Sequence, residues 1–106
     1  MNDTEFHRLA DDFYQLLTEK VDPYEDDIEW EINGSVLELE FADRSKIIIN
    51  RQEPLHQIWV ATKFNGHHFE YRAGTWIDNR EGGELFSFLS AAIAKQSGIT
   101  VSLTDA

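Results

Sequence analysis

The sequence contains no cysteine, so the chain forms no disulfide and has no thiolate to bind a metal or to act as a nucleophile. It also lacks any apolar run near the roughly 20 residues that a membrane-spanning helix requires. Its N-terminus has neither the basic nor the apolar region of a secretory signal. From these absences we expect a cytoplasmic protein that does not enter a membrane, and the length of 106 residues predicts one domain over residues 1–106.

Basic residues are scarce, since nine lysines and arginines stand against 20 aspartates and glutamates and the net charge is −11. The excess lies on the N-terminal side: residues 1–43 hold 14 acids and two bases, whereas residues 44–106 hold six acids and seven bases. Such a field repels nucleic acids and anionic lipids, and it attracts cations or basic protein surfaces. We therefore expect no nucleic-acid partner.

Apolar residues at helical spacing predict a helix over residues 3–21, capped by Asn2 and ended by Pro23. Its predicted buried stripe comprises Phe6, Leu9, Ala10, Phe13, Leu16, Leu17 and Val21. Strands are predicted at 28–32, 37–41, 46–50, 56–62, 67–72 and 75–77, and a second helix at 84–97. This order predicts an α+β fold, a two-layer α-β sandwich. Its N- and C-terminal helices would pack on one face of a mostly antiparallel five- to six-stranded sheet.

Asn33-Gly34 lies between two alternating segments, which predicts a hairpin with a two-residue turn. Such a turn fixes which residues of the two strands face each other. The predicted pairs are Ile32 with Ser35, Trp30 with Leu37, Ile28 with Leu39, Glu29 with Glu38, and Asp27 with Glu40.

Six carboxylates occur within Val21–Ile32 without a lysine or arginine among them. One interpretation is a solvated surface, and the other is a site whose counter-charge comes from outside the chain. The second is supported by Glu19 and Asp22 at a helix C-terminus, where the macrodipole disfavours anions, and by like charges facing each other across the hairpin. Carboxylates suit Ca²⁺, Mg²⁺, Mn²⁺ or iron. The candidate ligands are Glu19, Asp22, Glu25, Asp26, Asp27, Glu29 and Glu31, with Asp3 and His7 as a secondary group.

A second candidate surface lies in the central strands. Alternation in residues 56–62 places Gln57 and Trp59 on the open face of the sheet, near Asn50 of the preceding strand. An exposed tryptophan is typical of protein–protein contacts, and the alternative is a tryptophan half-covered by its neighbours. Asn50, Gln57 and Trp59 are therefore candidate partner-binding residues.

No catalytic motif is present, and we expect no enzymatic activity. His67 and His68 are adjacent on a predicted strand, so they face opposite sides and cannot chelate one ion together. The predicted first helix carries no Glu-x-x-His motif of the kind found at di-iron sites, because Thr4 stands three residues before His7.

The sequence resembles the frataxin family over essentially its whole length. The resemblance rests on NDTEFHRLAD near the N-terminus, EING at the hairpin and SKIIINRQEPLHQIWVATK over Ser45–Lys63, followed by GHHFEY, TWIDNREG and LFSFLSAAI. It departs mainly in residues 22–30, where family members vary in length but stay acidic.

The resemblance implies an acidic ridge on the first helix and strand that binds Fe²⁺ and Fe³⁺ weakly, and other divalent cations as well. It implies a mostly monomeric protein whose partners are the cysteine desulfurase IscS and the iron–sulfur scaffold complex. It also implies an iron-dependent regulator of cluster assembly or an iron donor, and the alternative is an acidic protein–protein adaptor with incidental metal binding. The implied partner-binding residues are Glu19, Asp22, Asn50, Gln57 and Trp59.

Overall fold

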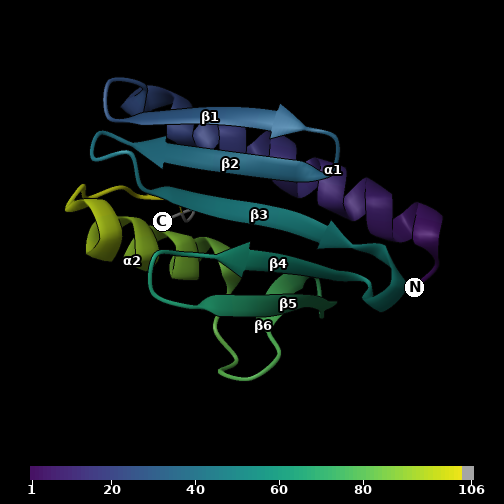
Figure 1. The fold of residues 1–106 in the computed structure, drawn as a ribbon. Helices are drawn as coiled ribbons and strands as arrows, with labels where there is room; N and C mark the ends of the chain where they lie inside the picture. Colours follow the sequence, from purple (N-terminus) through teal and green to yellow (C-terminus); the bar gives the residue numbers. More distant parts are fainter. Residues whose placement is uncertain (104–106) are drawn as a thin grey trace.

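Six strands form one antiparallel sheet, ordered as they occur in the chain, and two helices pack on one of its faces in the computed structural model, which describes residues 1–103. The elements are α1 (Asp3–Val21), η1 (Asp22–Tyr24), β1 (Ile28–Asn33), β2 (Val36–Phe41), β3 (Lys46–Gln52), η2 (Glu53–Leu55), β4 (Gln57–Ala61), β5 (Gly66–Arg72), β6 (Thr75–Asp78) and α2 (Leu85–Ser97). Figure 1 shows α1 and α2 behind the sheet, with its other face open. This arrangement confirms the predicted two-layer α+β sandwich.

Helix α1 begins and ends where the sequence predicts. The Asn2 side chain accepts a hydrogen bond from the backbone N–H of Glu5 at 2.8 Å, which satisfies one of the free donors at the helix start. The helix stops at Val21, and Pro23 then lies in the 3₁₀ turn η1. A proline cannot continue the hydrogen-bond ladder of an α-helix, so the chain leaves the helix axis at this point.

The buried face of α1 differs from the predicted stripe at two positions. Tyr14 is buried, because its hydroxyl donates hydrogen bonds to the carbonyl oxygens of Ser35 and Ile49. Leu16 is 45% exposed and does not belong to the core. The core joins both helices, the inner sheet face and the segment after α2, and it contains Phe6, Ala10, Phe13, Tyr14, Leu17, Val21, Ile28, Leu37, Leu39, Phe41, Ile47, Ile49, Ile58, Val60, Phe69, Trp76, Leu85, Leu89, Ile93, Val101 and Leu103.

The β1–β2 hairpin has a different register from the predicted one. Its turn residues are Gly34 and Ser35, with Asn33 paired to Val36. Gly34 has a φ of 60° and Ser35 has no positive φ, which matches a type II′ turn with glycine at its first central position. The predicted pairs are therefore wrong, although each partner moves by two positions and keeps its predicted face. The observed pairs are Ile28–Phe41, Glu29–Glu40, Trp30–Leu39, Glu31–Glu38 and Ile32–Leu37.

Strand β1 is the edge of the sheet, and this position exposes side chains that the alternation predicts to be buried. Ile28 is buried, but Trp30 is 44% exposed and Ile32 is 41% exposed. An edge strand has a neighbour on one side only, so fewer side chains cover it.

The C-terminal segment follows the sequence expectation as far as the structure describes it. Gly98 ends α2 with a φ of 78°, and Val101 and Leu103 are buried against the core. Residues 104–106 of the predicted returning tail lie outside the described residues. Within residues 1–103, neither helix has the length and hydrophobicity that crossing a bilayer requires.

Candidate functional site

Seven exposed carboxylates follow the chain from the last turn of α1, through η1 and the next turn, along β1. We call this set the acidic ridge: Glu19, Asp22, Glu25, Asp26, Asp27, Glu29 and Glu31. None of the seven forms an ion pair with a basic side chain of residues 1–103. Within the described residues, therefore, no ion pair offsets their mutual repulsion.

Two shallow hollows, each of about 210 Å³, lie beside the ridge on the open sheet face. Glu40 of β2 lines both, and Glu38 lines the second. Glu40 faces Glu29 and Glu38 faces Glu31 across the hairpin. Acidic residues therefore face each other as the sequence predicts, but in different pairs from the predicted ones. Asp27 lies in the turn before β1 and does not oppose Glu40.

Glu38 and Glu40 were not among the predicted ligands. Their alternation with the buried Leu37 and Leu39 is the signal that places them on the open face beside the ridge. Lys46 compensates them in part, because its ammonium lies 3.2 Å from a Glu38 oxygen and 3.9 Å from a Glu40 oxygen. The acidic surface thus extends from the ridge onto β2, where Lys46 offsets part of the negative charge.

The ridge is a row of carboxylates and not a closed metal cage. Among the described residues, the one group of three potential ligands with donor atoms mutually within 4.8 Å lies elsewhere. Hard cations tolerate such open arrangements by keeping most of their water ligands. The geometry therefore suits several loosely held cations better than one tightly bound ion.

The secondary ligand group, Asp3 and His7, is engaged inside the molecule. The His7 Nε2 lies 2.5 Å from a Glu53 carboxylate oxygen of η2, and Asp3 lies 2.8 Å from the His56 Nε2. The Arg51 guanidinium can only donate, so its 3.3 Å contact makes His7 Nδ1 an acceptor and leaves the ring proton on Nε2. An ion at His7 would have to displace one of these partners.

Asp11 completes this set of contacts. Its carboxylate lies 2.5 Å from an Arg51 nitrogen, and the guanidinium lies 4.6 Å from the centre of the Tyr14 ring. Asp3, His7 and Asp11 therefore do not converge on a common ion, because each contacts side chains of residues 51–56. We call these contacts the N-terminal network: Asp3–His56, His7–Glu53, His7–Arg51 and Asp11–Arg51.

The predicted partner-binding residues share one row of the open sheet face. Asn50, Trp59 and His68 are directly paired across β3, β4 and β5. Trp59 is half-buried, because its indole stacks on the His68 ring at 4.2 Å and 10°. Its indole N–H donates to Gln57 at 2.7 Å. Both interpretations of Trp59 hold in part: it lies on the open face and neighbouring side chains cover it partly.

Gln57 lies on the predicted face but is only 8% exposed. Its amide donates to Glu70 at 3.1 Å while its oxygen accepts from Trp59. Hydrogen bonds from Arg72 and then from Gln57 hold the pKa of Glu70 below its ordinary value. Gln57 therefore fixes the indole orientation more than it offers contact area.

Trp59 and the β1 edge are three strands apart, or about 14 Å at the usual strand spacing.

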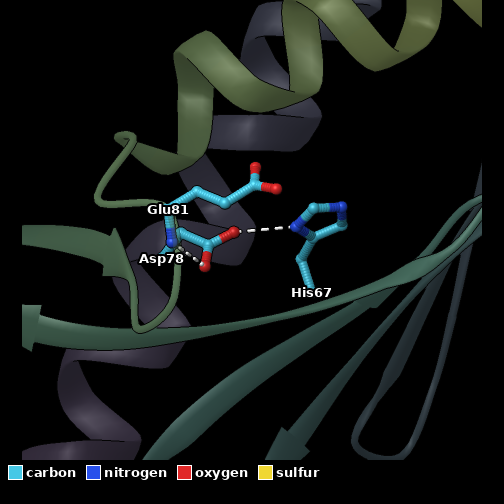
Figure 2. Close-up of side chains that lie close together, drawn as sticks. All are labelled: His67, Asp78 and Glu81. Carbon is cyan, nitrogen blue, oxygen red and sulfur yellow. Dashed lines mark hydrogen bonds and ion pairs between the residues drawn. The ribbon is translucent and has the colours of Figure 1, made fainter.

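His67 and His68 point to opposite sides of β5, as predicted. His68 stacks on Trp59, whereas His67 packs on Phe88 of α2 with ring centres 4.4 Å apart. On that side His67 lies near Asp78 and Glu81, a group shown in Figure 2. Sequence reasoning missed it, because 11 positions separate His67 from Asp78 and only the β5–β6 pairing brings them together.

Comparison with known proteins covers nearly the whole chain. A family model described as a frataxin-like domain matches residues 1–99. A relative from Psychromonas ingrahamii, named iron-sulfur cluster assembly protein CyaY, is 54% identical over 105 residues, which cover 99% of this chain and 100% of the relative. A protein of the same name from Tolumonas auensis is 53% identical, covering 97% of this chain and 99% of the relative.

Solved structures agree with this assignment. Frataxin from Psychromonas ingrahamii superposes with a TM-score of 0.92 at 54% identity, covering 99% of this chain and 100% of the other. Trimeric frataxin from the yeast Saccharomyces cerevisiae, solved in complex with ferrous iron, gives a TM-score of 0.73 at 27% identity and covers 85% of this chain and 86% of the other. This chain belongs to the frataxin family.

Proposed function

We propose that this chain is an iron-binding accessory protein of iron–sulfur cluster assembly that acts by binding and not by catalysis. The observation that carries the proposal is the acidic ridge, seven exposed carboxylates without a basic partner among residues 1–103. Oxygen ligands of this kind bind Fe²⁺ and Fe³⁺. The two relatives compared above are iron–sulfur cluster assembly proteins, and the yeast frataxin structure holds ferrous iron, which supports iron as the ion.

Binding at the ridge is weak and shared by several ions. Its donors do not converge, so each ion keeps much of its water shell and other divalent cations compete. Asp3 and His7 form a secondary group of ligands. They bind iron more weakly than the ridge, because they already contact Arg51, Glu53 and His56.

The proposed partners are the cysteine desulfurase IscS and the iron–sulfur scaffold complex, met in the cytoplasm by a mostly monomeric protein. The ridge docks through Glu19 and Asp22 on a basic patch of the desulfurase, which the surplus of negative charge favours. The sheet surface of Asn50, Gln57 and Trp59 offers a second, largely apolar contact. Iron on the ridge would then change the charge of the docking face, which supports an iron-dependent regulator or an iron donor.

An acidic adaptor with incidental metal binding is the second candidate, and the half-buried Trp59 on the open sheet face favours it. The two candidates differ in whether metal and partner share residues. If iron binding is functional, ridge variants change both iron binding and its effect on the desulfurase. For a plain adaptor, iron leaves complex formation unchanged.

The proposal is tested by anaerobic Fe²⁺ titration followed by amide NMR, with and without the desulfurase. Shifts are expected at Glu19, Asp22, 25–27, Glu29 and Glu31, with smaller shifts at Asp3 and His7. Because the proposal places iron at these carboxylates, uniform shifts over the whole surface would contradict it. The absence of shifts below millimolar iron would contradict it as well.

Two variants separate the surfaces. Glu19→Lys with Asp22→Lys should weaken both iron binding and desulfurase binding, and the loss of desulfurase binding should shrink at high salt. Trp59→Ala should cost about 2 kcal/mol of desulfurase binding, mostly through faster dissociation and with little salt dependence. It should leave iron binding unchanged. If the Trp59→Ala variant binds the desulfurase as tightly as the parent protein does, the sheet surface has no role and the ridge alone carries the function.

A further inference from the structure

Three side chains with metal-ligating atoms converge on the helix side of β5 and β6, away from the acidic ridge. His67 comes from β5, Asp78 ends β6, and Glu81 lies in the connection to α2. One donor atom from each lies within 4.8 Å of the others, the only such group among residues 1–103. Figure 2 shows the imidazole and both carboxylates pointing toward a common space. The convergence brings together a mixed nitrogen and oxygen donor set.

The charge of this cluster is not balanced by a fixed cation. Asp78 is only 3% exposed, and burial opposes its ionisation. The backbone N–H groups of Arg80 and Glu81 donate to one Asp78 oxygen, and the other Asp78 oxygen contacts His67. No lysine or arginine of residues 1–103 forms an ion pair with Asp78 or Glu81. Two carboxylates thus share one histidine, and a divalent cation would neutralise them.

The hydrogen bonds of His67 leave one ring nitrogen facing the carboxylates. Nδ1 lies 2.7 Å from an Asp78 oxygen, and Nε2 lies 2.8 Å from the Asn65 side-chain oxygen. Both neighbours are acceptors, whereas a neutral imidazole has a single proton to donate. A metal ion at Nδ1 would take the place of the proton shared with Asp78, while Nε2 would still donate to Asn65. Metal-ligating histidines characteristically donate their second nitrogen to an oxygen in this way.

The surroundings keep the ligands in place and leave room for water. Phe88 packs on the His67 ring, and one Asp78 oxygen accepts the two backbone N–H groups while the other faces His67. A hollow of about 210 Å³, lined by His67 and Glu81 together with Asn65 and Lys95, opens beside the group. An ion bound by three protein ligands would complete its coordination with water from this hollow.

We propose that His67 Nδ1, one Asp78 oxygen and the Glu81 carboxylate form a discrete site for one divalent transition-metal ion, separate from the loosely held cations of the ridge. An imidazole among the ligands selects Fe²⁺, Co²⁺ or Zn²⁺ over Mg²⁺ and Ca²⁺, which prefer oxygen ligands alone. The ridge consists of carboxylates and does not make this distinction. The two sites therefore differ in their metal preference as well as in their position.

The experiment is a Zn²⁺ titration of the whole protein in excess Mg²⁺, which occupies the ridge. Calorimetry measures the affinity, and ¹⁵N NMR of the histidine rings follows His67 Nδ1. We expect one equivalent of Zn²⁺ to shift the Nδ1 resonance, and Glu81→Gln to weaken this site at least tenfold. Asp26→Asn is the matched control on the ridge and should leave the site unchanged.

Glu81 is exposed, so its glutamine variant should fold normally, and Asp78→Asn gives a second test because its side-chain oxygen still accepts the backbone N–H groups. The proposal is overturned if Nδ1 does not respond to one equivalent of Zn²⁺, or if Glu81→Gln binds Zn²⁺ as the parent does. Neither result would affect the iron shifts expected on the ridge, so the two proposals fail separately.

Discussion

The N-terminal network and the acidic ridge contain acidic residues from consecutive parts of the chain. The acids of the network have partners inside the molecule, whereas those of the ridge form no ion pair with a described residue. In the network, Asp3, His7 and Asp11 each contact a residue of β3 or of the β3–β4 connection that follows it. In the ridge, seven carboxylates have no basic partner among residues 1–103. Acidic composition alone therefore does not identify a binding surface.

The difference comes from where the chain returns. The end of β3 and the β3–β4 connection lie against the N-terminal half of α1, which places Arg51, Glu53 and His56 beside it. Near the turn after η1, Arg44 lines the hollow beside Asp26 and Asp27 but pairs with Glu40, and β1 has a neighbouring strand on one side only. The network thus stabilises the fold, whereas the ridge leaves its charge available to ions and partners.

The largest effect is expected at Arg51, the centre of the network. Arg51→Met removes the ion pair with Asp11 and the cation over Tyr14, and should lower the free energy of unfolding by about 2 kcal/mol. Arg44→Met is the control, because Arg44 is 88% exposed and 3.6 Å from Glu40. It should change stability by less than about 0.5 kcal/mol. Equal effects in urea unfolding would refute the distinction between the two regions.

A pH effect of intermediate size is expected at Tyr14, beside Arg51. Burial raises the pKa of Tyr14 from 10.0 to about 12, although Arg51 opposes the rise. The folded protein thus favours the neutral phenol, and this contribution to stability is complete below pH 10 and is lost as the pH rises toward 12. Tyr14→Phe should lose less stability than the parent over this range, as urea midpoints measure. Parallel pH profiles of the two proteins would contradict the assignment.

Replacing aspartate by asparagine should change the melting temperature in opposite directions in the two regions, and by less than the effects above. Asp22→Asn, Asp26→Asn and Asp27→Asn together should raise the melting temperature by about 2–5 °C, because they remove repulsion without breaking a contact. Asp11→Asn should lower it, because it removes the partner of Arg51. Calorimetric scans in low salt without divalent ions measure both. A lower melting temperature of the triple variant would mean that the ridge acids have stabilising partners.

The smallest effect is that of added ions on the parent protein. Ca²⁺ or moderate salt should raise its melting temperature by about 1–3 °C, through binding to the folded state or through screening. The triple asparagine variant should respond less, because it carries less repulsion to relieve. An equal response of both proteins would place the ion effect outside the ridge.

Most of the fold could be predicted from the spacing of residues along the chain. The helical period, the Asn2 cap and Pro23 set the bounds of α1, and strict alternation put Trp59 on the open face and His67 and His68 on opposite faces. The hairpin register was predicted wrongly, because either Asn33-Gly34 or Gly34-Ser35 can form a two-residue turn. The choice depends on backbone angles: only Gly34 adopts a positive φ.

The sequence by itself determined the α+β sandwich, the position of the acidic ridge and the face of Trp59, because each depends on residues a few positions apart. Only the tertiary structure decided which acids are compensated. Asp3 and His56 are 53 positions apart, His7 and Glu53 are 46 apart, and Asp11 and Arg51 are 40 apart. It also decided that His67 and Asp78 meet. Packing of distant segments sets such approaches, and no local periodicity records them.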